Sequence, residues 1–383
     1  MGTPYSVQLG RKHEAVRTAL AAVGLDGVSV LPVVGARTPF GYRNQAKLVL
    51  RRTRTGVLAG LYAPGTHRVV DASACAVHHP AIGRVVTAVL ELLARGAPPI
   101  YDERHRNGAL RYLVVRYSVW QRAAQVTLVT AARAPGIAEL VRGLRRRCPT
   151  VRGVALNINP TPGNAIFGSQ WITLGGEAAI VERIGGMPLR ARAGSFLQAN
   201  PWIAGQLYRS VARWAEPRPG DTVVDLYAGI GGIAIGLAPL VRRVHAIEEN
   251  GIAADDARSN ARRNGVGNLR MLTGDVAHLL PDLRREIGHA DVVVLNPPRA
   301  GVTAGVLAEV GALRPRRVLY LSCDVHTLAR DLVVLGRLGY RTRRVQPADM
   351  LPQTDHVECL ALVEPAAPVS EGPLSESPRN ESP

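Results

Sequence analysis

Cysteine, lysine and long apolar runs are scarce in this 383-residue sequence, and each shortage excludes a class of protein. The four cysteines are far apart and form no C-x-x-C pair, which argues against a disulfide framework, a zinc site or a thioredoxin-like motif. No stretch approaches 18 uncharged apolar residues, so a transmembrane helix is excluded. The N-terminus lacks the apolar core of a secretory signal. We therefore expect a cytoplasmic protein with reduced thiols and no membrane partner.

Negative charge is also in short supply. The chain has 47 Lys and Arg against 30 Asp and Glu, which gives a formal net charge of +17. Only Lys12 and Lys47 are lysines, so arginine carries almost all of the positive charge. A compositional bias that trades lysine for arginine explains the choice of arginine, but it leaves the excess over acids unexplained. That excess indicates a polyanionic partner, most simply a nucleic acid.

The pattern of apolar residues changes near residue 190. Residues 1–190 mix helical and strand-like segments and predict a smaller α+β region, with arginine-rich runs suited to RNA. In residues 191–364 short apolar strands alternate with helices, which predicts the α/β class with an open parallel sheet covered on both faces. Two strand-like runs at its end predict an antiparallel hairpin. Residues 365–383 are rich in Pro, Ser and Glu and predict a disordered tail.

A glycine-rich turn follows the first apolar strand of the C-terminal region. This turn, residues 225–232, permits a tight bend and close approach of the backbone to a ligand. Glu248 stands 23 residues after Asp225, at the end of the next strand, where an acid can bind ribose hydroxyls. Asp275 follows the third strand, where an acid can bind an adenine amino group. The turn has no lysine, which excludes a P-loop and favours S-adenosylmethionine over NAD; a plain glycine turn with surface acids is the alternative.

Two further strand ends carry residues suited to chemistry. Asn296, Pro297, Pro298 and Arg299 form a rigid loop after one strand. By itself this N-P-P sequence resembles the loop of methyltransferases that act on exocyclic amines. Cys323 follows the next strand and precedes a helix, whose dipole predicts a lowered thiol pKa and hence a nucleophile.

A loop near the end of the chain supplies a candidate base. Glu358 is flanked by Val357 and Cys359, and desolvation there predicts a raised pKa and a useful proton acceptor. His356 is the rival base, and a solvated edge residue is the alternative for both. The cysteines interpreted as structural are Cys75, Cys148 and Cys359.

Together these segments resemble the RNA 5-methyluridine methyltransferases, which use S-adenosylmethionine to modify a uridine in ribosomal or transfer RNA. The resemblance runs from residues 39–44 (PFGYRN) to Val363. The most specific matches are residues 195–200, 322–331 and 349–358. The resemblance implies that Cys323 is the nucleophile and Glu358 the base.

The resemblance also implies a Rossmann-like class I methyltransferase domain in residues 191–364 and an RNA-binding domain in residues 1–190. The residues then assigned to cofactor binding are Gln198, Tyr227, Gly229, Glu248, Asp275 and Asn296. Those assigned to substrate binding are Arg299, Gln353 and His356, and no residue is assigned to a metal.

The chemistry of such a reaction explains the residue types. Uracil C5 is a poor nucleophile, and a thiolate that adds to C6 activates C5 to attack the sulfonium methyl. A base must then remove the C5 proton before the cysteine can leave. The target base must be single-stranded or flipped from its stack, and the affinity for RNA should fall steeply with salt.

The sequence departs from the family pattern in three ways. The family usually has Asp where this chain has Asn296, and Asn where it has Gly232. Several members also carry an N-terminal barrel and four cysteines that hold an iron–sulfur cluster. Only Cys75 resembles one of those cysteines, so we expect no cluster in this chain. The chain then begins just after the segment that would carry the other three, through loss in this lineage or through a mis-assigned start codon.

The leading hypothesis is a monomeric methyltransferase that forms 5-methyluridine in RNA, with 23S ribosomal RNA favoured and transfer RNA possible. One alternative is an RNA base amino-methyltransferase, which needs no nucleophilic cysteine. The other is an inactive RNA-binding factor that kept the fold.

Overall fold

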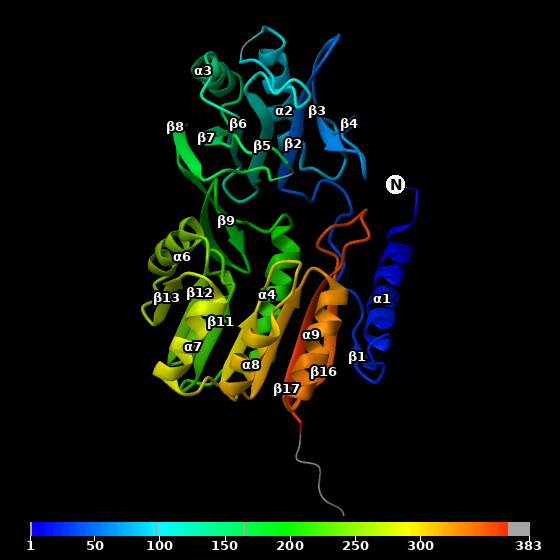
Figure 1. Ribbon diagram of the computed structural model, residues 1–383, viewed down its shortest axis with the longest axis vertical. Helices are drawn as coiled ribbons and strands as arrows, with labels where there is room; N and C mark the ends of the chain where they lie inside the picture. Colours follow the sequence, from blue (N-terminus) through cyan, green and yellow to red (C-terminus); the bar gives the residue numbers. More distant parts are fainter. Residues whose placement is uncertain (1, 97, 164, 367–383) are drawn as a thin grey trace, which may run out of the picture.

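The computed structural model of the protein describes residues 2–96, 98–163 and 165–366, so that all but two residues of the predicted tail lie outside the described residues. The chain builds two large sheets, one above the other in Figure 1, with a short hairpin between them. Within the described residues, no helix has the length and apolar character needed to cross a membrane.

The upper sheet has seven strands and is covered on one face by two helices. The strands, in their order across the sheet, are β4 (Val69–Asp71), β3 (Gly56–Tyr62), β2 (Gln45–Thr53), β5 (Leu110–Ser118), β6 (Ala123–Thr130), β7 (Val151–Ile158) and β8 (Gln170–Gly176). The helices are α2 (Pro80–Leu93) and α3 (Ile137–Arg147), whose apolar faces share one core with the sheet. The hairpin of β9 (Ala179–Ile184) and β10 (Met187–Arg192) follows.

The lower sheet has eight strands. In order across the sheet they are β1 (Ser29–Val30), β16 (Tyr340–Ala348), β17 (Glu358–Pro365), β15 (Arg317–Ser322), β14 (Val292–Leu295), β11 (Thr222–Leu226), β12 (Arg243–Glu248) and β13 (Leu269–Thr273). In β14, β15 and β17 the apolar residues run almost without a break, as expected for strands buried on both faces. Strand β17 alone runs antiparallel to its neighbours, β15 and β16.

Helices cover both faces of this lower sheet, which confirms the predicted α/β class with a Rossmann-like fold. One face packs against α4 (Pro201–Ala215), α5 (Gly232–Leu237) and α6 (Gly251–Arg263), with a 3-10 turn at Ala238–Leu240. The other packs against α1 (Tyr5–Ala21), α7 (Val276–Ile287), α8 (Ala304–Ala312) and α9 (Val325–Arg337). The predicted terminal hairpin is the β16–β17 pair.

Helix α1 packs against the lower sheet and β1 is one of its strands, although the predicted boundary places both in the region 1–190. Strand β1 pairs in parallel with β16, and α1 lies beside α9 and β16 (Figure 1). Val16 and Leu20 of α1 are fully buried in the same core as α9. The division at residue 190 stays a prediction, but the chain contributes to the lower sheet from both ends.

A buried hydrogen-bond network joins the two sheets. Arg116 of β5 donates to the carbonyl oxygens of Arg192 and Ser195, at 3.0 and 2.7 Å. The Ser195 hydroxyl donates to Asp256 of α6 at 2.5 Å, and Arg190 donates to the same carboxylate. Asp256 is fully buried, and a buried carboxylate is stable only when it is paired and hydrogen-bonded. The network therefore fixes the segment between β10 and α4 against both sheets.

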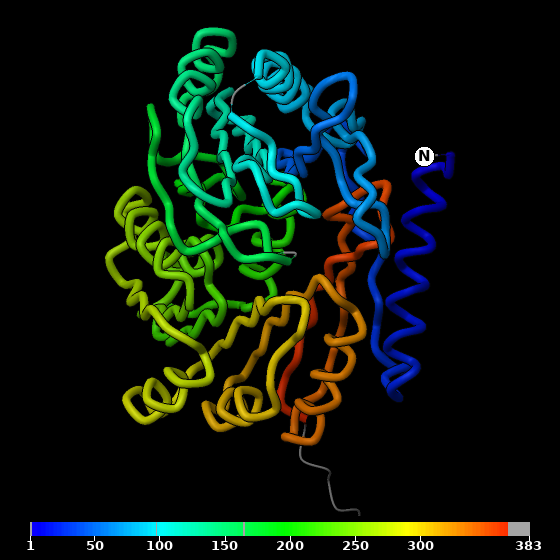
Figure 2. The backbone as a smooth tube through the Cα atoms, turned by 45° about the horizontal axis from the view of Figure 1, so that its top comes forward, coloured from blue at the N-terminus to red at the C-terminus, as the bar shows by residue number. Residues whose placement is uncertain are grey.

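A second buried ion pair connects α1 to the loop before β17. Lys12 Nζ lies 2.5 Å from Asp349 Oδ1 and also donates to the Leu351 carbonyl at 3.2 Å. Gln8, one turn earlier on α1, accepts a hydrogen bond from the Gln353 N–H. In Figure 2 the loop, drawn orange-red, lies next to the blue α1. The N-terminal helix thus holds the loop that leads to Glu358.

We expect Lys12→Met to lower the free energy of unfolding by about 3–5 kcal/mol, because it leaves the Asp349 carboxylate buried without its partner. Urea denaturation monitored by circular dichroism measures the effect. Glu14→Gln is the matched control on the same helix, since it breaks an exposed pair with Arg17 and should change stability by less than about 1 kcal/mol. Equal effects of the two substitutions would contradict this role for Lys12.

Candidate active site

The glycine-rich turn after β11 bends through the left-handed region of backbone space. Gly229 and Gly231 have φ of 57° and 82°, and Tyr227 adopts the same region at 62° despite its side chain. Gly231 caps α5, so the turn ends where that helix begins. The prediction of a tight glycine turn is confirmed.

Glu248 of β12 holds this turn in place. Its Oε2 accepts a hydrogen bond from the Gly229 N–H at 2.8 Å, and its Oε1 accepts from Asn250 N–H at 2.9 Å. A carboxylate has about four acceptor positions, so two remain for ligand hydroxyls. A Cβ built on Gly229 would meet no atom within 4 Å, so there is open space beside the turn. These features fit the ribose of S-adenosylmethionine.

The other predicted cofactor residues are Asp275, Tyr227, Asn296 and Gln198. Asp275 caps α7 through the His278 N–H, and Tyr227 has a pKa raised to about 12 by burial and by the nearby Asp275 carboxylate. The Asn296 N–H donates to the Leu226 carbonyl at 3.2 Å, which fixes the N-P-P loop beside β11. Gln198 is half-buried in the segment held by the Asp256 network. Their contacts with a cofactor stay predictions.

Sequence reasoning did not single out the buried Asp225 side chain. Asp225 lies within β11, before the last residue of the strand, and is fully buried. Burial raises the pKa of its carboxyl group to about 7. Its Oδ2 accepts from the Ala234 N–H, while its Oδ1 has no hydrogen-bond partner among the described residues. An acid within an apolar strand was the only sequence signal for this group.

The register of β15 and β17 brings the candidate nucleophile and base together. Ser322 pairs with Cys359 in this antiparallel ladder. This is the last pair of the ladder, and its register extended by one step would place Cys323 opposite Glu358. Electrostatic coupling between the two side chains agrees with this placement, because the Glu358 carboxylate raises the pKa of the Cys323 thiol.

Glu358 has the properties of a base in an apolar site. The side chain is buried, and burial raises its pKa to about 7, as the sequence predicts. The Arg299 guanidinium opposes part of that shift. Arg299 also lies 3.4 Å from His356 Nε2, and because a guanidinium only donates, this nitrogen must be the acceptor. His356 is therefore engaged with Arg299, and Glu358 is the better candidate base.

The predicted lowering of the Cys323 pKa is wrong. Burial raises the pKa of the thiol, the Glu358 carboxylate raises it further, and Arg299 offsets only part of the increase. Desolvation therefore outweighs the effect expected from the N-terminus of α9, which Asp324 caps by accepting from the His326 and Thr327 N–H groups at 3.0 Å each. Among the side chains that act on the thiol, Arg299 is the one that favours the thiolate.

Gln353 differs from the other predicted substrate residues in being held by its backbone. It has a φ of 67°, and its N–H donates to Gln8 of α1 at 3.1 Å. Tyr42 donates to the Pro352 carbonyl at 2.9 Å and Asn200 to the Met350 carbonyl at 3.4 Å. Loop 349–358 is thus fixed from three directions.

The structure explains why glycine occupies position 232, where the family usually has Asn. A Cβ at Gly232 would lie 2.6 Å from Cε2 of Tyr208, a half-buried side chain of α4. The Tyr208 ring occupies the space that a larger residue at 232 would need. The large side chain at position 208 of α4 thus requires a small residue at position 232 of α5, and no sequence pattern revealed this dependence.

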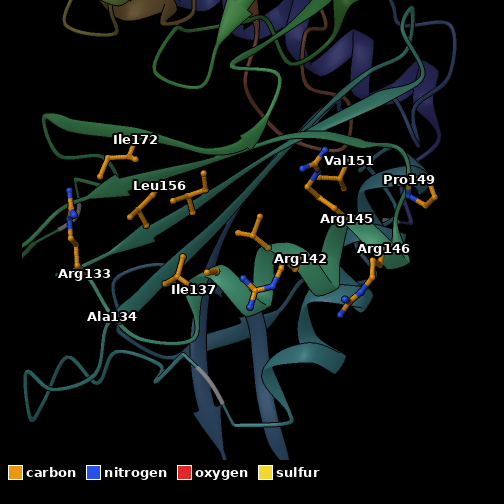
Figure 3. A pocket seen from close by; sticks show the side chains of 13 residues that line it. Arg133, Ala134, Ile137, Arg142, Arg145, Arg146, Pro149, Val151, Leu156 and Ile172 are labelled. Carbon is orange, nitrogen blue, oxygen red and sulfur yellow. The ribbon is translucent and has the colours of Figure 1, made fainter.

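The arginine-rich run of the upper sheet lines a large pocket on α3. The pocket has a volume of about 790 Å³. In Figure 3, Arg142, Arg145 and Arg146 extend from α3 around apolar side chains that include Leu156 and Ile172. These arginines are a candidate contact for an RNA backbone.

Known proteins with related sequences place this site in a family. The family model described as tRNA (Uracil-5-)-methyltransferase matches residues 183–365. An uncharacterized RNA methyltransferase of Geobacter sulfurreducens is 43% identical over 340 residues, which cover 88% of this chain and 69% of the relative. One of Gloeobacter violaceus is 40% identical over 365 residues, 94% of this chain and 78% of that relative. The chain belongs to the family of these RNA methyltransferases, and its C-terminal half matches the tRNA (Uracil-5-)-methyltransferase model.

A solved structure is similar over almost the whole chain. It is the tRNA (uracil-54, C5)-methyltransferase of Pyrococcus abyssi, in complex with S-adenosyl-L-homocysteine. The TM-score is 0.75 at 24% identity, and the match covers 94% of this chain and 84% of that one. The likeness supports the shared fold of S-adenosylmethionine-dependent methyltransferases, and the predicted family is confirmed.

Glu358 predicts a pH dependence of stability. The pKa of Glu358 in the folded protein is about 7, above its usual value of 4.5. The protonated side chain therefore contributes to the free energy of unfolding fully below pH 4.5, and this contribution is lost as the pH rises toward 7. We expect the wild type to lose up to about 3 kcal/mol more stability than Glu358→Gln between pH 4 and pH 8. Urea denaturation of both proteins at the two values measures this difference. Parallel losses would refute it, since Asp225 titrates equally in both proteins.

We expect Gly232→Asn to lower the free energy of unfolding by about 1–3 kcal/mol, because the new side chain collides with Tyr208. Tyr208→Ala should lower the free energy of unfolding less in the Gly232→Asn protein than in the wild type, because it makes room for the Asn side chain. Gly267→Asn is the control, because a Cβ there meets no atom within 4 Å. Additive effects of the two substitutions, measured by urea denaturation, would show that position 232 does not depend on Tyr208.

Proposed function

We propose that this protein transfers a methyl group from S-adenosylmethionine to C5 of a uridine in RNA, with 23S ribosomal RNA favoured and transfer RNA as the alternative. The observation that carries the proposal is the position of Cys323 opposite a buried Glu358 with a pKa of about 7. Such a pair suits an addition to C6 followed by removal of a proton from C5. The protein would act as a monomer on cytoplasmic RNA.

Each step has a group of this chain to perform it. The Cys323 thiolate forms a bond to uracil C6, and the electron pair of the C5–C6 double bond moves onto the O4 enolate. S-adenosylmethionine, when bound, would supply an electrophilic methyl group. C5 takes up this methyl as its bond to the sulfonium sulfur breaks, and S-adenosylhomocysteine is the leaving group. Glu358 then removes the proton from C5, the double bond reforms, and the C6–sulfur bond breaks to return the thiolate.

Arg299 supports both reacting side chains. Its positive charge lowers the pKa of the Cys323 thiol, and its Nη2 lies 3.4 Å from His356 Nε2. A guanidinium in this position favours the thiolate before addition and can bind a uracil oxygen that gains charge after it. Gln353 and His356, on the loop fixed by α1, would complete the contacts with the base.

The cofactor would lie along the turn after β11. Glu248 would accept hydrogen bonds from the ribose hydroxyls, and Asp275 would accept from the adenine amino group. Tyr227 and Gly229 would contact the cofactor between these two groups. Gln198 and Asn296 border the same edge, where the methyl group must face the uracil. The Asn296 amide replaces the family's usual Asp carboxylate, so it can donate as well as accept a hydrogen bond.

The test uses purified protein, tritiated S-adenosylmethionine and total RNA from a strain that lacks the gene. Digestion of the RNA identifies the labelled nucleoside. We expect label in 5-methyluridine, and we expect at least a 10³-fold loss in Cys323→Ala, because the nucleophile is removed. Label in a methylated adenine, guanine or cytosine that survives in Cys323→Ala would favour an amino-methyltransferase centred on Asn296. RNA binding without any label would favour an inactive binding factor.

Glu358→Gln separates the second step from the first. Without the base, the C5 proton stays and the C6–sulfur bond cannot break, so methylated RNA should remain attached to Cys323. We expect a protein–RNA band that resists denaturing gel electrophoresis in Glu358→Gln and is missing in Glu358→Gln/Cys323→Ala. Rapid turnover by Glu358→Gln without this band would assign the base to another residue, with His356→Ala as the next variant.

A further inference from the structure

A groove with a volume of about 650 Å³ lies where the two sheets meet, on the side of α4. It is lined by the chain between Ala36 and Tyr42, the turn between β5 and β6, the β9–β10 turn and the start of α4. None of the residues assigned to the cofactor, the substrate or catalysis lines it. The groove is therefore a separate feature that needs its own explanation.

The groove gathers aromatic side chains in a chain that has only 4% of them. Trp120, Trp202, Tyr42 and His79 all line it. Trp120 remains 49% exposed, and the Arg37 guanidinium stacks over Trp202 at 5.3 Å from the ring centroid. An exposed indole in a groove is a surface on which a flat ligand can stack.

The turn that presents Trp120 is held rigidly from below. The buried Glu182 carboxylate of β9 accepts hydrogen bonds from the Val119 and Trp120 N–H groups, at 2.8 and 3.3 Å. Gln121 accepts from the Val181 N–H at 2.7 Å. Trp120 is thus exposed on a fixed backbone, which lowers the entropy lost when a ligand binds.

The charge of the groove favours an anion. Arg37, Arg183 and Arg209 line it and are exposed, and within the described residues none of them forms an ion pair with a carboxylate. Glu182, the acidic residue of the lining, is buried and engaged with backbone amides. Unpaired arginines beside an exposed indole are typical of surfaces that bind single-stranded nucleic acid.

The wall of the groove is shared with the catalytic loop. Tyr42 donates to the Pro352 carbonyl, and Asn200, at the start of α4, donates to the Met350 carbonyl. A chain of RNA that occupies the groove would therefore press against the segments that position residues 349–358. The groove is therefore connected to loop 349–358, although none of the candidate catalytic residues lines it.

We propose that this groove binds an unpaired nucleotide of the RNA that carries the target uridine. Its base stacks on Trp120, and its phosphates lie against Arg183 and Arg209. The inference rests on the proposed function and adds a second contact with single-stranded RNA, outside the pocket that receives the uracil.

The test measures the binding of fluorescein-labelled oligouridylate of 12 nucleotides by fluorescence anisotropy, with the full chain at constant salt. Trp120→Ala should raise Kd about tenfold, because one base loses its stacking partner. Trp120→Phe should restore most of the affinity. Leu61→Ala is the matched control, since Leu61 is also 49% exposed but lies on β3. Arg209→Gln should weaken binding and reduce the slope of log Kd against log salt by about one.

The outcomes separate this inference from the proposed reaction. If Trp120→Ala and Leu61→Ala bind the oligonucleotide equally well, the groove is not an RNA site, whatever nucleoside the enzyme labels. Self-association that depends on Trp120, without an effect on the oligonucleotide, would assign the groove to a protein partner and overturn the inference. Binding that depends on Trp120 in a protein that labels no uridine would keep the groove and remove the uracil reaction.

Discussion

The main-chain register between β15 and β17 is the constraint on which the candidate site depends. In a purely parallel sheet, the first residue of a strand lies at the edge opposite to the last residue of its neighbour. Strand β17 enters the sheet in the reverse direction, so Glu358, its first residue, lies beside Cys323, which follows the last residue of β15. A one-residue slip of this ladder would turn the carboxylate to the other face of the sheet.

The loop before β17 is also held by a contact with the N-terminal helix. The Lys12–Asp349 pair links residues 337 positions apart in the sequence, and both side chains are buried. Pairs of this kind add little net stability, yet the loss of one partner is costly. Helix α1 therefore helps to fix the loop that leads to Glu358.

Parallel strands made part of this site predictable from the sequence. The carboxyl ends of such strands meet at one edge, so Gly229, Glu248 and Cys323 were expected to lie together, and burial of Glu358 followed from its apolar neighbours. The thiol pKa was not predictable from position alone, because burial and the Glu358 carboxylate, which tertiary packing brings to the thiol, raise it. The contact of Tyr208 with residue 232 depends on how α4 crosses α5, and local sequence does not encode that crossing.

Arginine serves two separate purposes in this chain, and only one of them concerns RNA. Arg116 and Arg192 are directed inward, where the planar guanidinium donates in two directions to carbonyl or carboxylate oxygens. Arg37, Arg183 and Arg209 line the groove without a carboxylate partner among the described residues. The net charge of +17 is therefore a poor guide to where RNA would be attracted, because some of the arginines are engaged inside the protein. Besides the arginines of α3, the proposed groove offers guanidinium groups beside aromatic rings, an arrangement that favours unpaired bases over a duplex.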